Sequence, residues 1–184
     1  NKILLNFCTE DFPNMEGDLP SDLLELIKEN DCIEIYWFIE NYKAWKKHLH
    51  AIEIADHNTH IICTDDDHLY PEYFIEWLYV SYCYYGKKNP VTLNTTLVCH
   101  NLWSFNGPGT LYRKSDWKDY KKYLTHDILH NCWEDIFITI LFALNKVMIL
   151  PVIFHYPNDK DLLYNDVFAF SDPVVMKTTV EGKQ

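Results

Sequence analysis

The feature that most constrains this chain is an apolar run that ends abruptly in three consecutive carboxylates, Asp65, Asp66 and Asp67. The run before them, residues 61–63, reads Ile-Ile-Cys, which is typical of a strand buried on both faces of a parallel sheet. The polar residues begin where such a strand would leave the sheet, and α/β sheets bind their ligands at that edge. We therefore expect an α/β fold with its functional site directly after this strand.

The three carboxylates allow two interpretations. Alternate residues of a strand point the same way, so Asp65 and Asp67 would face one side roughly 7 Å apart. At an effective dielectric of about 20, that pair would repel by roughly 2 kcal/mol. A divalent ion such as Mg2+, bound by one or two carboxylates and by substrate phosphates, would offset the repulsion. The alternative is a solvated acidic turn that caps a helix beginning near residue 71.

Hydrophobic periodicity predicts alternating strands and helices along the chain. Strands are expected over residues 2–7, 32–38, 61–63, 91–93, 96–99 and 147–154. Helices are expected over residues 22–29 with Ser21 as N-cap, 42–54 with one basic side, 72–85, parts of 114–130, and 133–146. This alternation favours a mostly parallel sheet with helices on both faces. Asn131 would cap the last helix, which gives Glu134 the place of a capping-box carboxylate.

Composition excludes several classes of protein. With 184 residues, of which 48% are hydrophobic, the chain can bury a core as one domain. Its formal net charge of -11 and the lack of a basic stripe argue against nucleic-acid binding. Six cysteines without any C-x-x-C pair fit a reducing compartment, and no apolar run approaches the 18 or so residues of a membrane span. We expect a cytoplasmic protein with, at most, peripheral contact with the inner face of the membrane.

Several segments together resemble bacterial glycosyltransferases of the GT-A fold, a Rossmann-like α/β fold, of the kind that build capsule or lipopolysaccharide sugars. The segments are Phe12-Pro13-Asn14, Glu40-Asn41, Trp45-Lys46-Lys47, residues 64–71, Gly107-Pro108-Gly109 and Trp133-Glu134-Asp135-Ile136. The likeness predicts a catalytic domain over residues 1–156 and a tail over residues 157–184. Members of the family open with a further strand and helix, so we expect the strand at residues 2–7 to lie exposed along one edge.

The resemblance also implies roles for single residues. The acidic triplet matches the family's D-x-D motif, in which Asp65 and Asp67, with Asp66 beside them, hold Mn2+ or Mg2+ against the donor diphosphate. The remaining matches are a basic pair near the donor nucleotide, Lys46 and Lys47; the catalytic base of an inverting enzyme, Asp135, with Glu134 next to it; and an extra metal ligand, His155. Gly107 and Gly109 permit close backbone approach to the ligand, and they are equally good turn residues.

The expected function is metal-dependent transfer of a sugar from a nucleotide-sugar donor to a saccharide or lipid-linked saccharide acceptor, in bacterial surface polysaccharide synthesis. Two alternatives stay open. A nucleotidyltransferase also uses metal-bound carboxylates on an α/β sheet, but the Gly-rich basic loop expected near its first strand is not visible in the sequence. A non-catalytic carbohydrate-binding or scaffold domain would fit the aromatic content of 16%.

Overall fold

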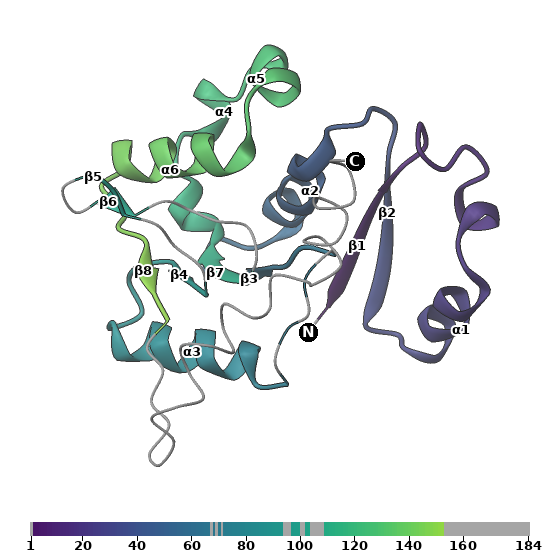
Figure 1. Cartoon of the computed structure of the whole chain (residues 1–184), viewed down its shortest axis with the longest axis horizontal. Helices are drawn as coiled ribbons and strands as arrows, with labels where there is room; N and C mark the ends of the chain where they lie inside the picture. The colour runs from purple at the N-terminus through teal and green to yellow at the C-terminus, as the bar shows by residue number, and fades with distance from the viewer. Residues whose placement is uncertain are drawn as a thin grey trace, which may run out of the picture. The chain divides into compact units, whose positions relative to one another are not determined.

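The computed structural model of the chain describes residues 2–66, 68, 70, 72–93, 97–99, 102–103 and 109–152. The chain divides into two compact units, and neither is a continuous piece of sequence. Unit 1 comprises Asn1–Asp56 and Asp119–Glu134, and unit 2 comprises His57–Lys118 and Asp135–Gln184. Figure 1 shows the elements of both units in the order of the colour bar.

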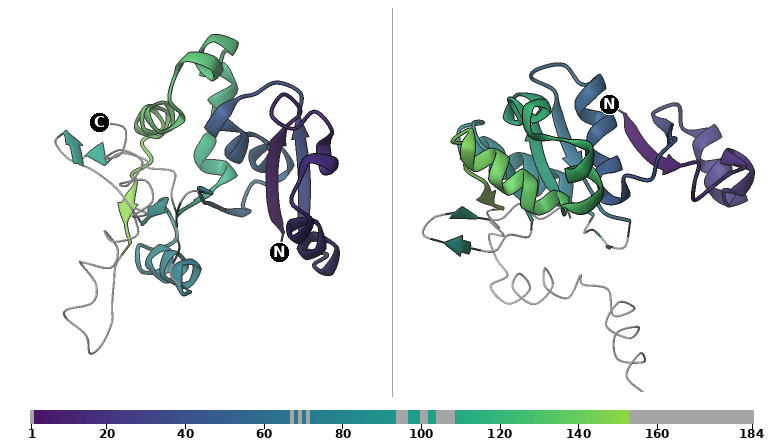
Figure 2. Two further views of the ribbon diagram at one scale, coloured as in Figure 1. Left: turned by 45° about the vertical axis from the view of Figure 1, so that its right-hand side comes forward. Right: turned by 90° about the horizontal axis from the view of Figure 1, so that it is seen from above.

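Unit 1 is built on two parallel strands, β1 (Ile3–Cys8) and β2 (Ile33–Phe38), which pair in register along their whole length. Within the described residues, β1 pairs with β2 alone. Helices α1 (Ser21–Glu29) and α2 (Lys46–Ile54) lie on opposite sides of this pair (Figures 1 and 2). The shorter helices of unit 1 are η1 (Met15–Asp18), η2 (Lys43–Trp45), α4 (Tyr120–Tyr123) and α5 (His126–Asn131).

Two predicted N-caps, Ser21 and Asn131, are wrong, for identifiable reasons. Ser21 is the first helical residue of α1 and not its N-cap, because Pro20 occupies the extended capping position before it. Asn131 is the last residue of α5, so it cannot cap the next helix. Its side-chain amide instead donates to the Asp127 carboxylate at 2.9 Å, one turn earlier in the same helix.

Unit 2 contains a four-stranded sheet in the order β3-β7-β4-β8. Strand β7 runs antiparallel to both of its neighbours, whereas β4 and β8 are parallel. A separate antiparallel pair joins β5 and β6. The bounds are β3 (His60–Cys63), β4 (Val91–Thr92), β5 (Leu97–Cys99), β6 (Leu102–Trp103), β7 (Thr110–Arg113) and β8 (Leu150–Pro151).

The predicted α/β class is confirmed, but the predicted mostly parallel sheet is wrong. The sheets are small, and two of the three pairings in the four-stranded sheet are antiparallel. The cause is β7, which lies between two strands that run the opposite way. Its sequence, Thr-Leu-Tyr-Arg, follows Gly107-Pro108-Gly109 and carries no local mark of its direction.

The side chains of successive residues of β7 pack on opposite sides of the sheet. Leu111 belongs to a cluster with Leu78 and Tyr82 of α3 (Phe74–Tyr84) and with Val91 of β4. Tyr112 points the other way, with its ring centroid 5.7 Å from that of Trp117. Trp117 in turn meets Phe142 of α6 (Glu134–Leu144), and the 3-10 helix η3 (Lys114–Trp117) carries it there. Helices α3 and α6 thus cover opposite sides of the sheet, as Figure 1 shows.

None of the described helices is both long enough and apolar enough to span a lipid bilayer. All residues of the tail expected over residues 157–184 lie outside the described part of the chain. The last described strand, β8, begins at Leu150, later than the predicted strand over residues 147–154, of which residues 153–154 are not described.

The α3 cluster gives a direct test of where the core of unit 2 lies. Leu78 is fully buried, whereas Val80 on the same helix is 53% exposed. Leu78→Ala should therefore lower the free energy of unfolding by about 2–5 kcal/mol through lost burial and a residual cavity. Val80→Ala, the matched control, should change it by less than about 0.5 kcal/mol. Urea unfolding measures both, and equal costs would contradict this core.

Candidate functional site

Three strands of the four-stranded sheet end at one level. Cys63 pairs with Thr110, Thr110 with Thr92, and Thr92 with Pro151, so these four residues form a row across the sheet. Because β7 is antiparallel to its neighbours, β3, β4 and β8 all run in one direction. Their carboxyl ends share an edge with the amino end of β7, which is the kind of edge where α/β sheets bind ligands.

A buried hydrogen bond fixes the middle of this row. The Thr110 hydroxyl donates to the Thr92 hydroxyl at 2.8 Å, and both residues are fully inaccessible to solvent. Burying a hydroxyl without a partner is costly, so this hydrogen bond stabilises the pairing of the two strands. The pair holds β7 and β4 in the one register that brings Gly109 to the edge.

The acidic segment leaves the sheet at this edge. Asp65 is half-buried, two residues beyond the end of β3, and Asp66 is exposed. The Asp65 backbone N–H donates to the Tyr70 hydroxyl at 2.8 Å. The Tyr70 ring lies 4.6 Å from that of Phe74, which packs against the core cluster. An aromatic contact to the core thus holds the backbone of the acidic segment in place, while Asp67 lies outside the described residues.

Gly109 lies at the same edge, immediately before Thr110, and it has a left-handed conformation with φ of +64°. A side chain here would place its Cβ 2.3 Å from Cδ1 of Leu93, so the neighbouring leucine fills the space that glycine leaves. The Leu93 N–H also donates to the Gly109 carbonyl at 3.0 Å. A turn conformation and the packing of Leu93 therefore suffice to require glycine. Gly107 and His155 lie outside the described residues.

The two lysines expected to meet the donor belong to unit 1, and both have carboxylate partners there. Lys46 Nζ lies 3.3 Å from a carboxylate oxygen of Asp11 and donates to the side-chain carbonyl of Asn41 at 3.0 Å. The Asn41 amide donates to both Asp11 oxygens at 2.9 Å. Lys47 Nζ lies 3.1 Å from a Glu134 oxygen. A diphosphate at these lysines would have to displace carboxylates.

Glu134 does not form the predicted capping box. It is the first residue of α6 and not the third, because the helix begins later than the sequence pattern suggested. Its carboxylate reaches Lys47 instead, with only 13% of the Glu134 side chain and 18% of the Lys47 side chain exposed. Asp135, the next residue, is half-buried and belongs to unit 2, and its carbonyl accepts from the Thr139 hydroxyl at 2.7 Å.

The basic side predicted for residues 42–54 is only partly solvated. His48 of α2 is completely buried, and burial, with a smaller effect of the adjacent Lys47 charge, holds the pKa of His48 well below its usual range. His50 stacks on Tyr36 of β2 with ring centroids 3.8 Å apart. Burial likewise lowers the pKa of His50. These imidazoles are neutral packing groups near pH 7 and not part of a cationic surface.

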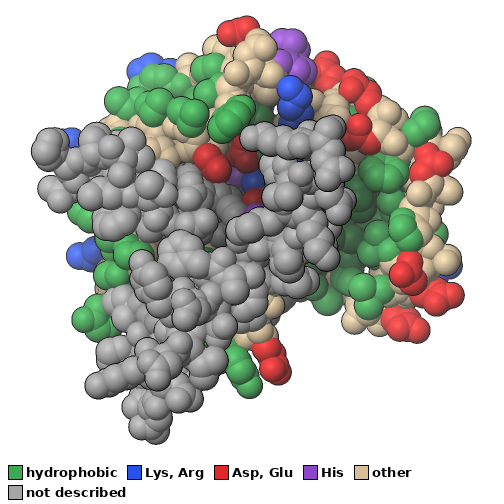
Figure 3. Space-filling view, viewed as in Figure 1, with side chains coloured by type: hydrophobic (Ala, Val, Ile, Leu, Met, Phe, Trp, Pro, Cys, Tyr) green, Lys and Arg blue, Asp and Glu red, His purple; other side chains and the backbone are tan. Residues whose placement is uncertain are grey.

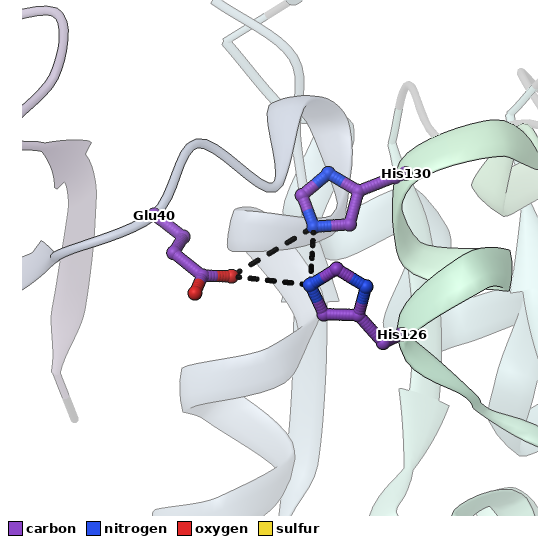
Figure 4. Close-up of side chains that lie close together, drawn as sticks. All are labelled: Glu40, His126 and His130. Carbon is purple, nitrogen blue, oxygen red and sulfur yellow. Dashed lines mark hydrogen bonds and ion pairs between the residues drawn. The ribbon is translucent and has the colours of Figure 1, made fainter.

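A cluster that the sequence reasoning missed lies at the carboxyl end of β2. Glu40 follows that strand, and His126 and His130 lie one turn apart on α5 (Figure 4). One Glu40 oxygen is 3.7 Å from Nε2 of each histidine, and the two Nε2 atoms are 3.1 Å apart. The H-x-x-x-H spacing was a visible signal for the two histidines. Glu40 carries no such signal, because it lies far earlier in the chain.

Within the described residues, each unit thus contains one group of polar side chains that could bind a metal ion. In unit 2, hard carboxylate oxygens stand at the strand ends, which is the ligand type that Mg2+ and Mn2+ prefer. In unit 1, two imidazoles and a carboxylate converge, which is a softer set. No protein-family profile matches this chain, and no curated protein sequence matches it.

The half-buried Lys47–Glu134 pair should contribute measurable stability. A double-mutant cycle with Lys47→Gln and Glu134→Gln should give a coupling energy of about 1–2 kcal/mol in denaturant unfolding, because both groups are largely withdrawn from water. The reference is the Lys2–Glu34 pair, whose side chains are 60% and 41% exposed. For that pair the coupling should be under about 0.5 kcal/mol. A coupling for Lys47 and Glu134 no larger than the reference would show that the pair is not formed in solution.

Proposed function

We propose that this chain is a metal-dependent glycosyltransferase, which moves a sugar from a nucleotide sugar to a saccharide acceptor. The observation that supports it best is the shared edge in unit 2. There the resemblance assigns donor binding to Asp65, Asp66 and Gly109, and the sheet register brings the segments that carry them to one level. The acidic triplet and the glycine motif lie far apart in the chain, so the approach of Asp65 and Gly109 to one edge supports the proposal.

The donor set at this edge fits the ion that the resemblance implies. Asp65 and Asp66 offer carboxylate oxygens, and such oxygens suit Mg2+ or Mn2+. When bound, the ion would stabilise charge on the leaving diphosphate as a Lewis acid. The hydrogen bond from the Asp65 N–H to Tyr70 fixes the backbone of Asp65 before any ligand binds, which reduces the entropic cost of binding.

Asp135 is the proposed general base. It lies in the first turn of α6, in the same unit as the acidic segment, and it is half-buried. The neighbouring Glu134 is committed to Lys47, which makes it the weaker candidate. Of the two carboxylates assigned to catalysis from the sequence, Asp135 therefore keeps the role of proton acceptor.

Donor binding is tested by calorimetry and thermal shift with a panel of nucleoside diphosphates, each with and without Mn2+. Binding should require the metal, and a ligand at 100 times its dissociation constant should stabilise the parent by about 2.7 kcal/mol. Asp65→Asn should abolish the metal-dependent shift. Glu76→Gln, an exposed carboxylate on α3, is the matched control and should behave like the parent. Unchanged binding in Asp65→Asn would refute the assignment of this edge.

The chemical step is tested by release of nucleoside diphosphate from the donor with a panel of saccharide acceptors. Asp135→Asn should lower turnover by about 10²–10⁴-fold while donor binding stays unchanged, as expected for loss of a general base. Glu134→Gln should mainly reduce stability. Pyrophosphate release from a nucleoside triphosphate would favour a nucleotidyltransferase instead. If no nucleotide bound with metal, a non-catalytic carbohydrate-binding or scaffold domain would be the better description.

A further inference from the structure

We propose that Glu40, His126 and His130 form a zinc-class metal site in unit 1, separate from the carboxylate edge of unit 2 and independent of the function proposed above. The three side chains come from two distant stretches of the chain, and their ligand atoms all lie within 4.8 Å of one another. In Figure 4 both Nε2 atoms point toward the same Glu40 carboxylate. Such convergence of two imidazoles and a carboxylate on one point suits a single ion.

The distances agree with a common coordination centre. Zinc lies about 2.0–2.1 Å from its nitrogen and oxygen ligands, so at tetrahedral angles two ligand atoms stand about 3.3 Å apart. The observed separations are 3.1 Å between the two Nε2 atoms and 3.7 Å from each Nε2 to a Glu40 oxygen. Shifts of a few tenths of an ångström in side chains this exposed would bring all three to ligand distance.

The ligand types select the class of ion. Imidazole suits Zn2+, Cu2+, Ni2+ and Fe2+, whereas Mg2+ and Ca2+ prefer sets made of oxygen alone. Three protein ligands would leave a fourth position open to water. The side chains of His126 and Glu40 are 76% and 49% exposed, so this position faces solvent. Figure 3 shows histidine and acidic side chains beside one another at the surface over α5.

Tyr42 contacts two of the three proposed ligands. The ring of Tyr42 lies 5.8 Å from that of His130. The Tyr42 hydroxyl also donates a hydrogen bond to the Glu40 carboxylate. Partners of this kind orient metal ligands, and their loss typically lowers affinity by 10–100-fold. Thr125 caps α5 by accepting from the Ile128 N–H at 3.3 Å, which fixes the turn that presents both histidines.

The site would cross-link the two stretches of chain that make unit 1. Glu40 lies in the first stretch, directly after β2, and both histidines lie in the second, on α5. An ion that binds the folded arrangement and not the separated segments stabilises it by mass action. The proposed role is therefore structural, with one coordination position left for an exchangeable ligand.

Zinc titration of the chelator-treated full chain, by calorimetry and by competition with a chromogenic chelator, tests the site. We expect one Zn2+ per chain, and at least about 100-fold weaker binding in His126→Gln and in His130→Gln, since each loses a direct ligand. Tyr42→Phe should weaken binding about 10-fold. The controls are His57→Gln, an exposed histidine in unit 2, and Cys132→Ser, a free thiol two residues after His130. Both controls should bind like the parent.

Metal selectivity and spectroscopy complete the test. Affinity should rise from Mn2+ through Co2+ to Ni2+ and Cu2+, and Mg2+ should not compete with Zn2+. The Co2+ form should show visible d–d bands that His126→Gln removes. Zinc binding that survives both histidine substitutions, that is lost in Cys132→Ser, or that appears only at millimolar metal would overturn the proposal. Circular dichroism confirms that the variants are folded, so that loss of binding reports loss of the ligand.

Discussion

The pairing of β7 with both β3 and β4 is the constraint on which the rest of unit 2 depends. One antiparallel strand between two others makes those two run the same way, and it aligns Cys63, Thr110 and Thr92 in one row. The buried Thr110–Thr92 hydrogen bond allows little slippage, because a shift by one residue would turn every side chain of β7 to the other side of the sheet. Leu111 would then lose the core cluster, and Tyr112 would lose Trp117.

Much of the fold followed from the sequence. The strands at residues 2–7, 32–38 and 61–63 and the helices at 22–29 and 133–146 were found because their hydrophobic periods are strong. The direction of β7 was not predicted, because a sequence of four residues carries no information on which strands it will pair with. The cap of the last helix was also missed, because Asn131 ends α5 and its amide donates to Asp127 within that helix.

For the candidate sites too, features marked by a local sequence pattern were predicted and features that depend on long-range contacts were not. The acidic triplet was recognisable because an apolar strand ended in charge, and the sheet does bring Asp65 to an edge with Gly109. The sequence did not reveal which lysine side chains form ion pairs with carboxylates of the same chain. The chain has 27 acidic and 16 basic residues, so a lysine readily finds a carboxylate, and Lys46 and Lys47 both do. The Glu40, His126 and His130 cluster depends on a long-range contact, which no local pattern contains.

Because each unit consists of two separate stretches of sequence, the division limits where the chain can be cut and when each unit can finish folding during synthesis. Residues 57–118 interrupt unit 1, and residues 119–134 interrupt unit 2. A single cut anywhere in the gene therefore leaves at least one unit without part of itself. The indole of Trp45 donates to the Cys132 carbonyl at 3.1 Å. Because Cys132 follows most of the sheet strands of unit 2 in the sequence, this hydrogen bond can form only after those strands have been synthesised. Closing so long a loop adds little to the entropic cost of folding, but contacts between residues far apart in the chain slow folding.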